Sequence, residues 1–354
     1  MNIRYFLYFA FLFFCIGCKQ TDNKSNSSIQ FPDNITLSAD SIGMDVVIKP
    51  GTIYDVDPFI VVSDVSETRK SHYAVFDKNL KYLYSFCDYG EAPEECLLPT
   101  VIKNGNSDTF IVRDHANDSF HCFELTDSCA IPGKVFHVKR SDLNESLWEI
   151  NHVSGDKYLA KCSSPKSSIR RLIDFSSGTV LDSVAQTFDL QKTMGDDYYT
   201  EFDDCWIVSN GKHFACAYYF IDRIEFGVID NDHLKTNSFV GTDTPPDFYR
   251  YTDEELTGKY KYNVDYNPVC YEWLFTDGND VYASYFGFPW GDIDRHSSVV
   301  EKFDFEGKPL LKMTLDVSLA SFVVDDSRII GINPERSDDV FYIYEMRYST
   351  EKAP

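Results

Sequence analysis

The chain has 354 residues, of which 25% are charged, 43% are apolar and 16% are aromatic. This composition is that of a globular protein, and it excludes a disordered, collagen-like or multi-span membrane chain. Its 33 Lys and Arg residues are outnumbered by 56 Asp and Glu residues. The resulting net charge of −23 argues against nucleic-acid binding, which depends on clustered cations. The many Phe and Tyr residues favour strands over helices.

The N-terminus carries an export signal. Arg4 precedes an apolar run that is too short to span a membrane but has the length of a signal-peptide core. The run leads into Cys15-Ile16-Gly17-Cys18, which resembles the lipobox of bacterial lipoproteins, although Cys15 stands where that box usually has an aliphatic residue. The resemblance implies that residues 1–17 are removed and that Cys18 is acylated, with palmitate for example, and anchors the chain. The alternative is an ordinary signal peptide with two incidental cysteines.

A polar segment without periodicity follows the lipobox and predicts a flexible tether over residues 18–34. Beyond it, short β-branched or aromatic runs such as 59–62, 109–112 and 341–344 are bounded by turn residues. Nothing helical of sufficient length for a parallel α/β sheet lies between them. We therefore expect an all-β protein.

An apolar pair followed by an acid and a turn recurs six times along the chain. Consecutive acids are 47, 50, 56, 74 and 41 residues apart, close to the length of one four-stranded propeller blade. The repeat predicts one six-bladed β-propeller over residues 35–348, closed by the N-terminal strand joining the last blade, with a tail at 349–354. A pair of β-sandwiches is the alternative. The six acids are Asp77, Glu124, Asp174, Asp230, Asp304 and Glu345.

The last blade is similar to that of TolB-like six-bladed propeller lipoproteins from Gram-negative bacteria, over residues 300–309 and 322–326. The first repeat matches that family less well, because segment 90–96 keeps Gly90, Pro93 and the following acid but replaces two glycines and a phenylalanine. The resemblance implies a propeller at the cell envelope, anchored in the outer membrane. It implies no particular activity.

Eight cysteines remain once Cys15 and Cys18 are set aside, and an even number of cysteines in an exported protein suggests disulfides. The alternative is that several are buried thiols that act as small hydrophobic residues. These eight cysteines form no Cys-x-x-Cys or Cys-x-x-His pair, and we expect neither a metal nor a cofactor. The local disulfide candidates are Cys87 with Cys96, Cys122 with Cys129, and Cys205 with Cys216.

Signatures of common enzyme classes are absent from the sequence. It contains no Gly-x-Ser-x-Gly elbow, no His-Glu-x-x-His motif and no Walker-type glycine loop. The segment Asp230-Asn231-Asp232 begins like a calcium-binding loop but lacks the later ligands, so we interpret it as a turn. His115 and His296 stand near acids in expected loops, where a solvated charge pair outweighs a catalytic role. No catalytic residue can be assigned.

The longest interval between repeat acids contains an insertion at about 244–268 that is rich in aromatic residues. Rings at one face of a propeller can stack on sugars or anchor a partner, although a small hydrophobic lid is the alternative. The sequence therefore predicts a non-catalytic, envelope-anchored lipoprotein that binds an envelope protein, a peptide or a glycan through one face. A propeller-type lyase or glycosidase using channel carboxylates, with or without Ca²⁺, is the second hypothesis. The expected ligand-binding rings are Tyr249, Tyr251, Tyr260, Tyr262, Trp273 and Trp290.

Overall fold

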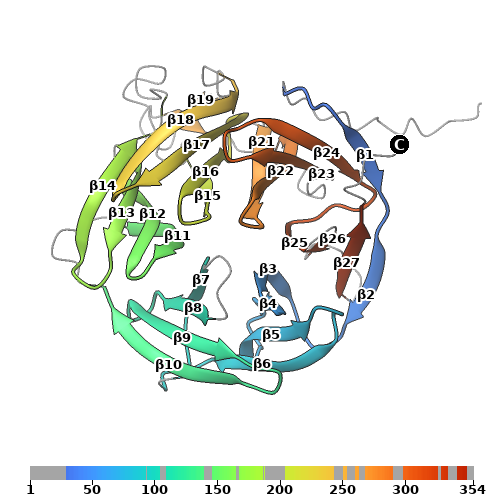
Figure 1. Cartoon of the computed structure of the whole chain (residues 1–354). Coiled ribbons are helices and arrows are strands. Elements are labelled where there is room, and N and C mark those ends of the chain that lie inside the picture. The colour runs from blue at the N-terminus through green and yellow to red at the C-terminus, as the bar shows by residue number, and fades with distance from the viewer. Residues whose placement is uncertain are drawn as a thin grey trace, which may run out of the picture.

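The computed structural model describes residues 29–92, 94–103, 109–138, 146–164, 167–185, 187, 204–242, 250–252, 260–262, 268–289, 298–325, 328–333 and 341–348. Within these ranges every regular element is a strand, and no helix is long and apolar enough to cross a membrane. Six sheets stand around a common axis as blades, each with its first strand nearest the axis (Figure 1). The structure confirms the predicted six-bladed β-propeller.

The strands of each blade follow one another along the chain and pair antiparallel with their neighbours. Blade 1 comprises β3 (Pro50–Val56), β4 (Phe59–Asp64), β5 (Ser71–Asp77) and β6 (Tyr82–Asp88). Blade 2 comprises β7 (Pro99–Ile102), β8 (Thr109–Asp114), β9 (Ser119–Leu125) and β10 (Ala130–His137). Blade 3 comprises β11 (Ser146–Ser154), β12 (Lys157–Ser164), β13 (Ser167–Asp174) and β14 (Thr179–Ala185).

The remaining blades repeat this order. Blade 4 comprises β15 (Cys205–Ser209), β16 (His213–Tyr218), β17 (Arg223–Asp230) and β18 (His233–Gly241). A short hairpin of β19 (Arg250–Thr252) and β20 (Tyr260–Tyr262) follows, inside the predicted insertion. Blade 5 comprises β21 (Pro268–Thr276), β22 (Asp280–Pro289), β23 (Val299–Asp304) and β24 (Pro309–Leu315). Blade 6 begins with β25 (Ser321–Asp325), β26 (Arg328–Ile332) and β27 (Phe341–Arg347).

The N-terminal segment closes the ring along its rim (Figure 1). Strand β2 (Asp40–Met44) pairs antiparallel with β27 and supplies the outer strand of blade 6, as the sequence predicts. Strand β1 (Asn34–Leu37) instead pairs in parallel with β24 and adds a fifth strand to blade 5. The start of the described chain therefore stabilises two neighbouring blades rather than one.

The recurring acids explain the repeat in physical terms, because each lies on the third strand of a blade and three of them bind the turn that follows. The Asp77 carboxylate accepts hydrogen bonds from the N–H groups of Asn79 and Lys81, both at 2.9 Å. Asp174 and Asp304 accept equivalent main-chain hydrogen bonds in their own turns. A carboxylate at this position satisfies turn N–H groups that the strands leave unpaired.

The fourth blade uses a different turn at the same place. Asn231 and Asp232, which connect β17 to β18, both have positive φ angles, 46° and 68°. Two central residues with positive φ are typical of a type I′ hairpin turn, which Asn and Asp tolerate better than most residues. This finding supports the interpretation of the segment as a turn rather than a calcium-binding loop.

The hydrophobic core lies between adjacent blades rather than within any one of them. For example, Val61 and Val75 of blade 1 cluster with Phe110 and Phe123 of blade 2, and all four are buried. Each large apolar side chain removed from water in this way contributes about 1.5 to 3 kcal/mol. A single blade would expose both of its apolar faces, so the ring as a whole is the stable unit.

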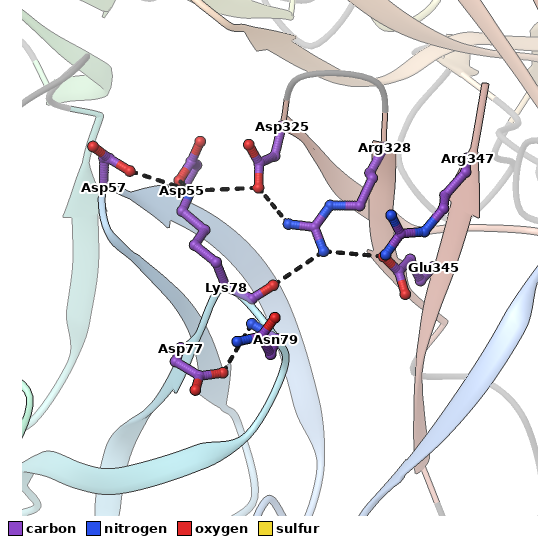
Figure 2. Close-up of polar contacts among 9 residues, drawn as sticks. All are labelled: Asp55, Asp57, Asp77, Lys78, Asn79, Asp325, Arg328, Glu345 and Arg347. Carbon is purple, nitrogen blue, oxygen red and sulfur yellow. Dashed lines mark hydrogen bonds and ion pairs between the residues drawn. The ribbon is translucent and has the colours of Figure 1, made fainter. Parts of the chain in front are cut away.

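An ion-pair network joins blade 6 to blade 1 where the ring closes (Figure 2). Nζ of Lys78 lies 2.6 Å from the carboxylate of Asp55 and 3.9 Å from that of Asp325. Arg328 donates to the main-chain oxygen of Lys78 and to the Glu345 carboxylate, both at 3.0 Å. Burial raises the pKa of Asp55, while the Lys78 ammonium opposes that shift. The network thus helps to close the ring through ion pairs, in addition to the strand pairing of β2 with β27.

Candidate functional site

Two cavities meet at the face of the ring where the inner strands begin, which we refer to as the mouth face. One is a groove between blades 1 and 2 with a volume of about 560 Å³, and the other is an axial cavity of about 210 Å³. Five residues line both cavities and so mark their junction. They are Thr52, Tyr54, Thr100, His115 and Trp148.

An aromatic platform stands at this junction. Trp148 remains 49% exposed although it lies at the inner end of blade 3. The imidazole of His115 stacks on it, with ring centroids 5.8 Å apart and an interplanar angle of 30°, and its Nε2 lies 2.8 Å from Oγ1 of Thr100. The sequence suggests only a solvated loop charge for His115, whereas the structure places it at the mouth.

A β-bulge in β11 sets the position of this platform. The register between β11 and β12 shifts between Trp148 and Asn151, and Glu149 has a φ of 45°. A left-handed conformation at a residue other than glycine costs roughly 1 to 3 kcal/mol and needs support from its surroundings. The side-chain amide of Asn151 provides it by donating to the main-chain oxygens of Glu149 and Ile207, at 3.0 and 3.1 Å. Bulges of this kind re-aim side chains next to binding sites.

An ion pair and two tryptophans occupy the axial cavity. Nζ of Lys103 lies 3.0 Å from the Glu149 carboxylate, 5.5 Å from the ring centroid of Trp206 and 4.9 Å from that of Trp273. Cation–π contacts at these distances hold the ammonium in place. Trp273 itself is only 6% exposed, and its Nε1 donates to the main-chain oxygen of Phe322 at 2.7 Å. It therefore supports the cavity from within rather than projecting from the surface.

The other rings expected from the sequence are not brought to the mouth by any described contact. Tyr249 and Trp290, like the lipidation candidate Cys18, lie outside the described residues. The remaining three, Tyr251, Tyr260 and Tyr262, belong to the β19–β20 hairpin, where Tyr251 is opposite Lys261.

Sequence reasoning missed Trp148 and Trp206, which line the axial cavity together with Trp273. The sequence has four tryptophans, and these three lie on the inner strands of consecutive blades, about one blade length apart in the chain. Comparison of equivalent positions in successive repeats could have found them. A search for local aromatic density could not.

The described carboxylates that line the groove and the axial cavity are already bound to other groups. Asp64 accepts main-chain hydrogen bonds from Ile48, Lys49 and Ser66 at 2.8 to 3.1 Å. Glu149 forms the ion pair with Lys103. A glycosidase needs one carboxyl group as an acid and a second as a base or nucleophile at a fixed separation. Both described carboxylates of these two cavities are thus held by neighbouring groups of the protein.

Three potential metal ligands meet beneath the groove, where Cys96, Asp114 and His121 are buried with donor atoms within 4.8 Å of one another. The Asp114 carboxylate accepts main-chain hydrogen bonds from Leu97, Leu98 and Ala116. Asp64 makes the same pattern in blade 1, where no cysteine stands nearby in the sequence. The repeated pattern indicates that Asp114 has a structural role, because its carboxylate holds the connection between two blades in place. We therefore assign no metal to the cluster.

The cysteine candidates separate into two kinds. The thiols of Cys87 and Cys96 contact each other, as do those of Cys205 and Cys216, and all four residues are buried as free thiols. In contrast, Cys129 is hydrogen-bonded across a turn to Thr126. Thr126 is itself four residues after Cys122 in the chain. Four strand residues span about 13 Å, beyond the Cα separation of about 7 Å that a disulfide tolerates. The expectation of a disulfide between Cys122 and Cys129 is therefore not retained.

No family model matches the chain, and no curated protein matches it in sequence. Among solved structures it is similar to a Bacteroides fragilis protein thought to be exported, with a TM-score of 0.55 and 13% identity over 90% of this chain and 100% of the other. It is also similar to the β-propeller domain of Cps50 (Swd1) from Myceliophteria thermophila, with a TM-score of 0.47 and 10% identity over 86% and 99% of the two chains. BamB from Moraxella catarrhalis gives a TM-score of 0.41 and 12% identity over 86% of each chain. At these identities the likeness concerns the fold alone, and the chain is a six-bladed β-propeller.

Proposed function

We propose that this protein is a lipoprotein of the cell envelope that binds a glycan at the mouth face. The observation that carries the proposal is the half-exposed ring of Trp148, backed by His115 over a groove of about 560 Å³. The apolar face of a sugar stacks on an indole, and pockets of roughly 300 to 1,000 Å³ are the usual size for small ligands.

The walls of the groove suit a ligand rich in hydroxyl groups. Thr52, Ser63 and Thr100 place side-chain hydroxyls along it, and Oγ of Ser63 already pairs with the main chain of Thr52. Hydroxyls both donate and accept hydrogen bonds, so they can match sugar hydroxyls in either orientation. The alternative ligands are an envelope protein or a peptide, and the test below distinguishes them from a glycan.

The location is part of the same proposal. The lipobox-like segment ending in Cys18 supports acylation, and stable attachment needs two or more acyl chains because one chain alone is marginal. A TolB-like kinship and an outer-membrane address are consistent with the fold and the signal. Replacement of Cys18 by Ala should move the protein to the soluble fraction, whereas unchanged membrane fractionation without fatty-acid labelling would contradict the anchor.

Binding is tested with the detergent-solubilised full chain on a panel of neutral and acidic oligosaccharides. We expect Trp148→Ala to weaken glycan binding by about 2 kcal/mol or more, as for an anchor at the centre of a site. Tyr82→Ala removes a ring that is 39% exposed on the outer strand β6 and should leave binding unchanged. Capture of peptides but no glycan, or full binding by Trp148→Ala, would overturn the proposal.

A further inference from the structure

Building on the proposed function, we infer that the glycan is a uronate-containing oligosaccharide whose carboxylate is bound by Arg69. Arg69 lines the groove together with Trp148 and His115. One ligand can therefore contact the guanidinium and the aromatic platform at the same time.

The guanidinium of Arg69 is held at one edge and open at the other. Its Nε donates to Nδ1 of His72 at 2.8 Å, and its Nη1 donates to the main-chain oxygen of Ser66. Tyr89 covers one side, with its ring centroid 5.9 Å from Cζ. A guanidinium carries five N–H groups, of which these contacts use two. The three that remain among the described residues include both on Nη2, which suits a two-pronged bond to a carboxylate.

Arg69 has no acidic partner within salt-bridge distance in the described part of the chain, although acids far outnumber bases in the sequence. The other cations at the mouth are neutralised, since Lys103 pairs with Glu149 and Arg113 pairs with Asp118. The groove does contain one carboxylate, Asp64, but its oxygens accept three main-chain hydrogen bonds. Arg69 is therefore the cation of the groove that is available to an anionic ligand.

His72 acts as a positioning residue for this cation. It is 2% exposed, and its Nε2 donates to the main-chain oxygen of Cys96 at 2.8 Å, which leaves Nδ1 as the acceptor for Arg69. Burial lowers the pKa of His72, so the ring stays neutral and keeps that lone pair. A charge placed by a buried partner loses less side-chain entropy on binding than a free surface arginine does.

A uronate fits this arrangement better than a neutral sugar does. Its carboxylate is attached to the ring that would stack on Trp148, and Arg is the side chain whose planar fork matches a carboxylate. A neutral sugar offers the guanidinium only uncharged hydroxyl acceptors, which form weaker hydrogen bonds than a carboxylate does. The inference thus selects one chemical class within the proposed function.

The test compares an oligogalacturonate with the same oligosaccharide after reduction of its carboxyl groups to alcohols. The full chain should bind the uronate form about ten-fold or more tightly than the reduced form, because charge-assisted hydrogen bonds are stronger than neutral ones. Arg69→Gln should abolish this preference while binding to the reduced sugar persists. Lys70→Gln is the matched control: it removes the same charge from the next residue, whose side chain is 90% exposed and does not line the groove.

The possible results separate the two proposals. Equal binding of both sugars by the unmodified protein, or an intact preference in Arg69→Gln, would overturn the role of Arg69 while leaving glycan binding in place. Loss of both sugars only in Trp148→Ala would support the platform. Binding of neither sugar would overturn the inference, and the wider glycan panel would then decide the proposed function separately.

Discussion

His72 donates from Nε2 to the main-chain oxygen of Cys96, so that its other ring nitrogen faces Nε of Arg69. This contact ties the third strand of blade 1 to the connection that leads into blade 2. It fixes the neutral tautomer of a buried imidazole. Because burial lowers the pKa of this ring, the effect of acid on the stability of the folded chain can be derived.

The free energy of unfolding should fall as the pH drops below about 6.5. Burial lowers the pKa of His72 in the folded chain below its ordinary value of 6.5, so the unfolded chain binds a proton first and is stabilised by it. His72→Gln retains a donor and an acceptor but does not titrate. Denaturant unfolding at pH 7.5, 6.5 and 5.5 should therefore show a shallower pH dependence for the variant. Identical slopes would contradict this assignment.

Two of the three tryptophans that line the axial cavity, Trp148 and Trp273, should differ sharply in their effect on stability. Trp273→Ala removes a ring that is 6% exposed and hydrogen-bonded to Phe322, and it should cost about 3 to 5 kcal/mol. Trp148→Ala removes a half-exposed ring and should cost less than about 1 kcal/mol. Thermal melting of both variants measures the contrast. A large loss of stability in Trp148→Ala would show that this ring is part of the core.

The ring-closing network should contribute to stability through Arg328 and very little through Arg347. Both guanidiniums bond to Glu345, but the Arg328 side chain is 15% exposed and also reaches blade 1, whereas that of Arg347 is 71% exposed (Figure 2). Arg328→Gln should lower the free energy of unfolding by about 2 kcal/mol, because charged hydrogen bonds are lost. Arg347→Gln should change it by no more than about 0.5 kcal/mol. Equal effects in urea denaturation would contradict a role for the blade contact.

Cys87 and Cys96 are expected to form a disulfide in protein folded in an oxidising compartment. Their thiols are adjacent, and the N–H of Cys96 donates to the main-chain oxygen of Asp88, the residue next to Cys87, at 3.0 Å. Mass spectrometry of unreduced protein should find them linked, and reduction should lower stability by about 2 to 3 kcal/mol. Eight alkylatable thiols in the native mature protein would show that these cysteines serve only as core residues.

Most of the architecture could be predicted because one local requirement recurs in several blades. A tight turn between the third and fourth strands of a blade leaves N–H groups to be satisfied, so Asp77, Asp174 and Asp304 stand at matching places and reveal the period. Strand β1 was not foreseen, since four residues in a polar context carry no clear signal for pairing in parallel with β24.

The candidate site could not be predicted in the same way, because it depends on contacts between blades. Arg69, His115 and Trp148 belong to blades 1, 2 and 3 and converge only when the ring forms. The left-handed conformation of Glu149 also has no signature in the sequence, where glycine would have been the expected residue. The density of aromatic residues along the chain instead predicts a site in the insertion at 244–268, because it reflects only neighbours in the sequence and not contacts between blades.

The path of the first described residues shows where an anchoring tether would join the propeller. The ring of Phe31 lies 5.3 Å from that of Phe303, which immediately precedes the turn at Asp304. In an antiparallel blade that turn lies at the face opposite the mouth. If Cys18 is held in a bilayer, the predicted tether reaches the propeller from below, at a distance of up to roughly 35 Å for the eleven residues before Ile29. The tether would then leave the propeller on the side opposite the groove, so that its attachment would not obstruct a long polysaccharide bound there.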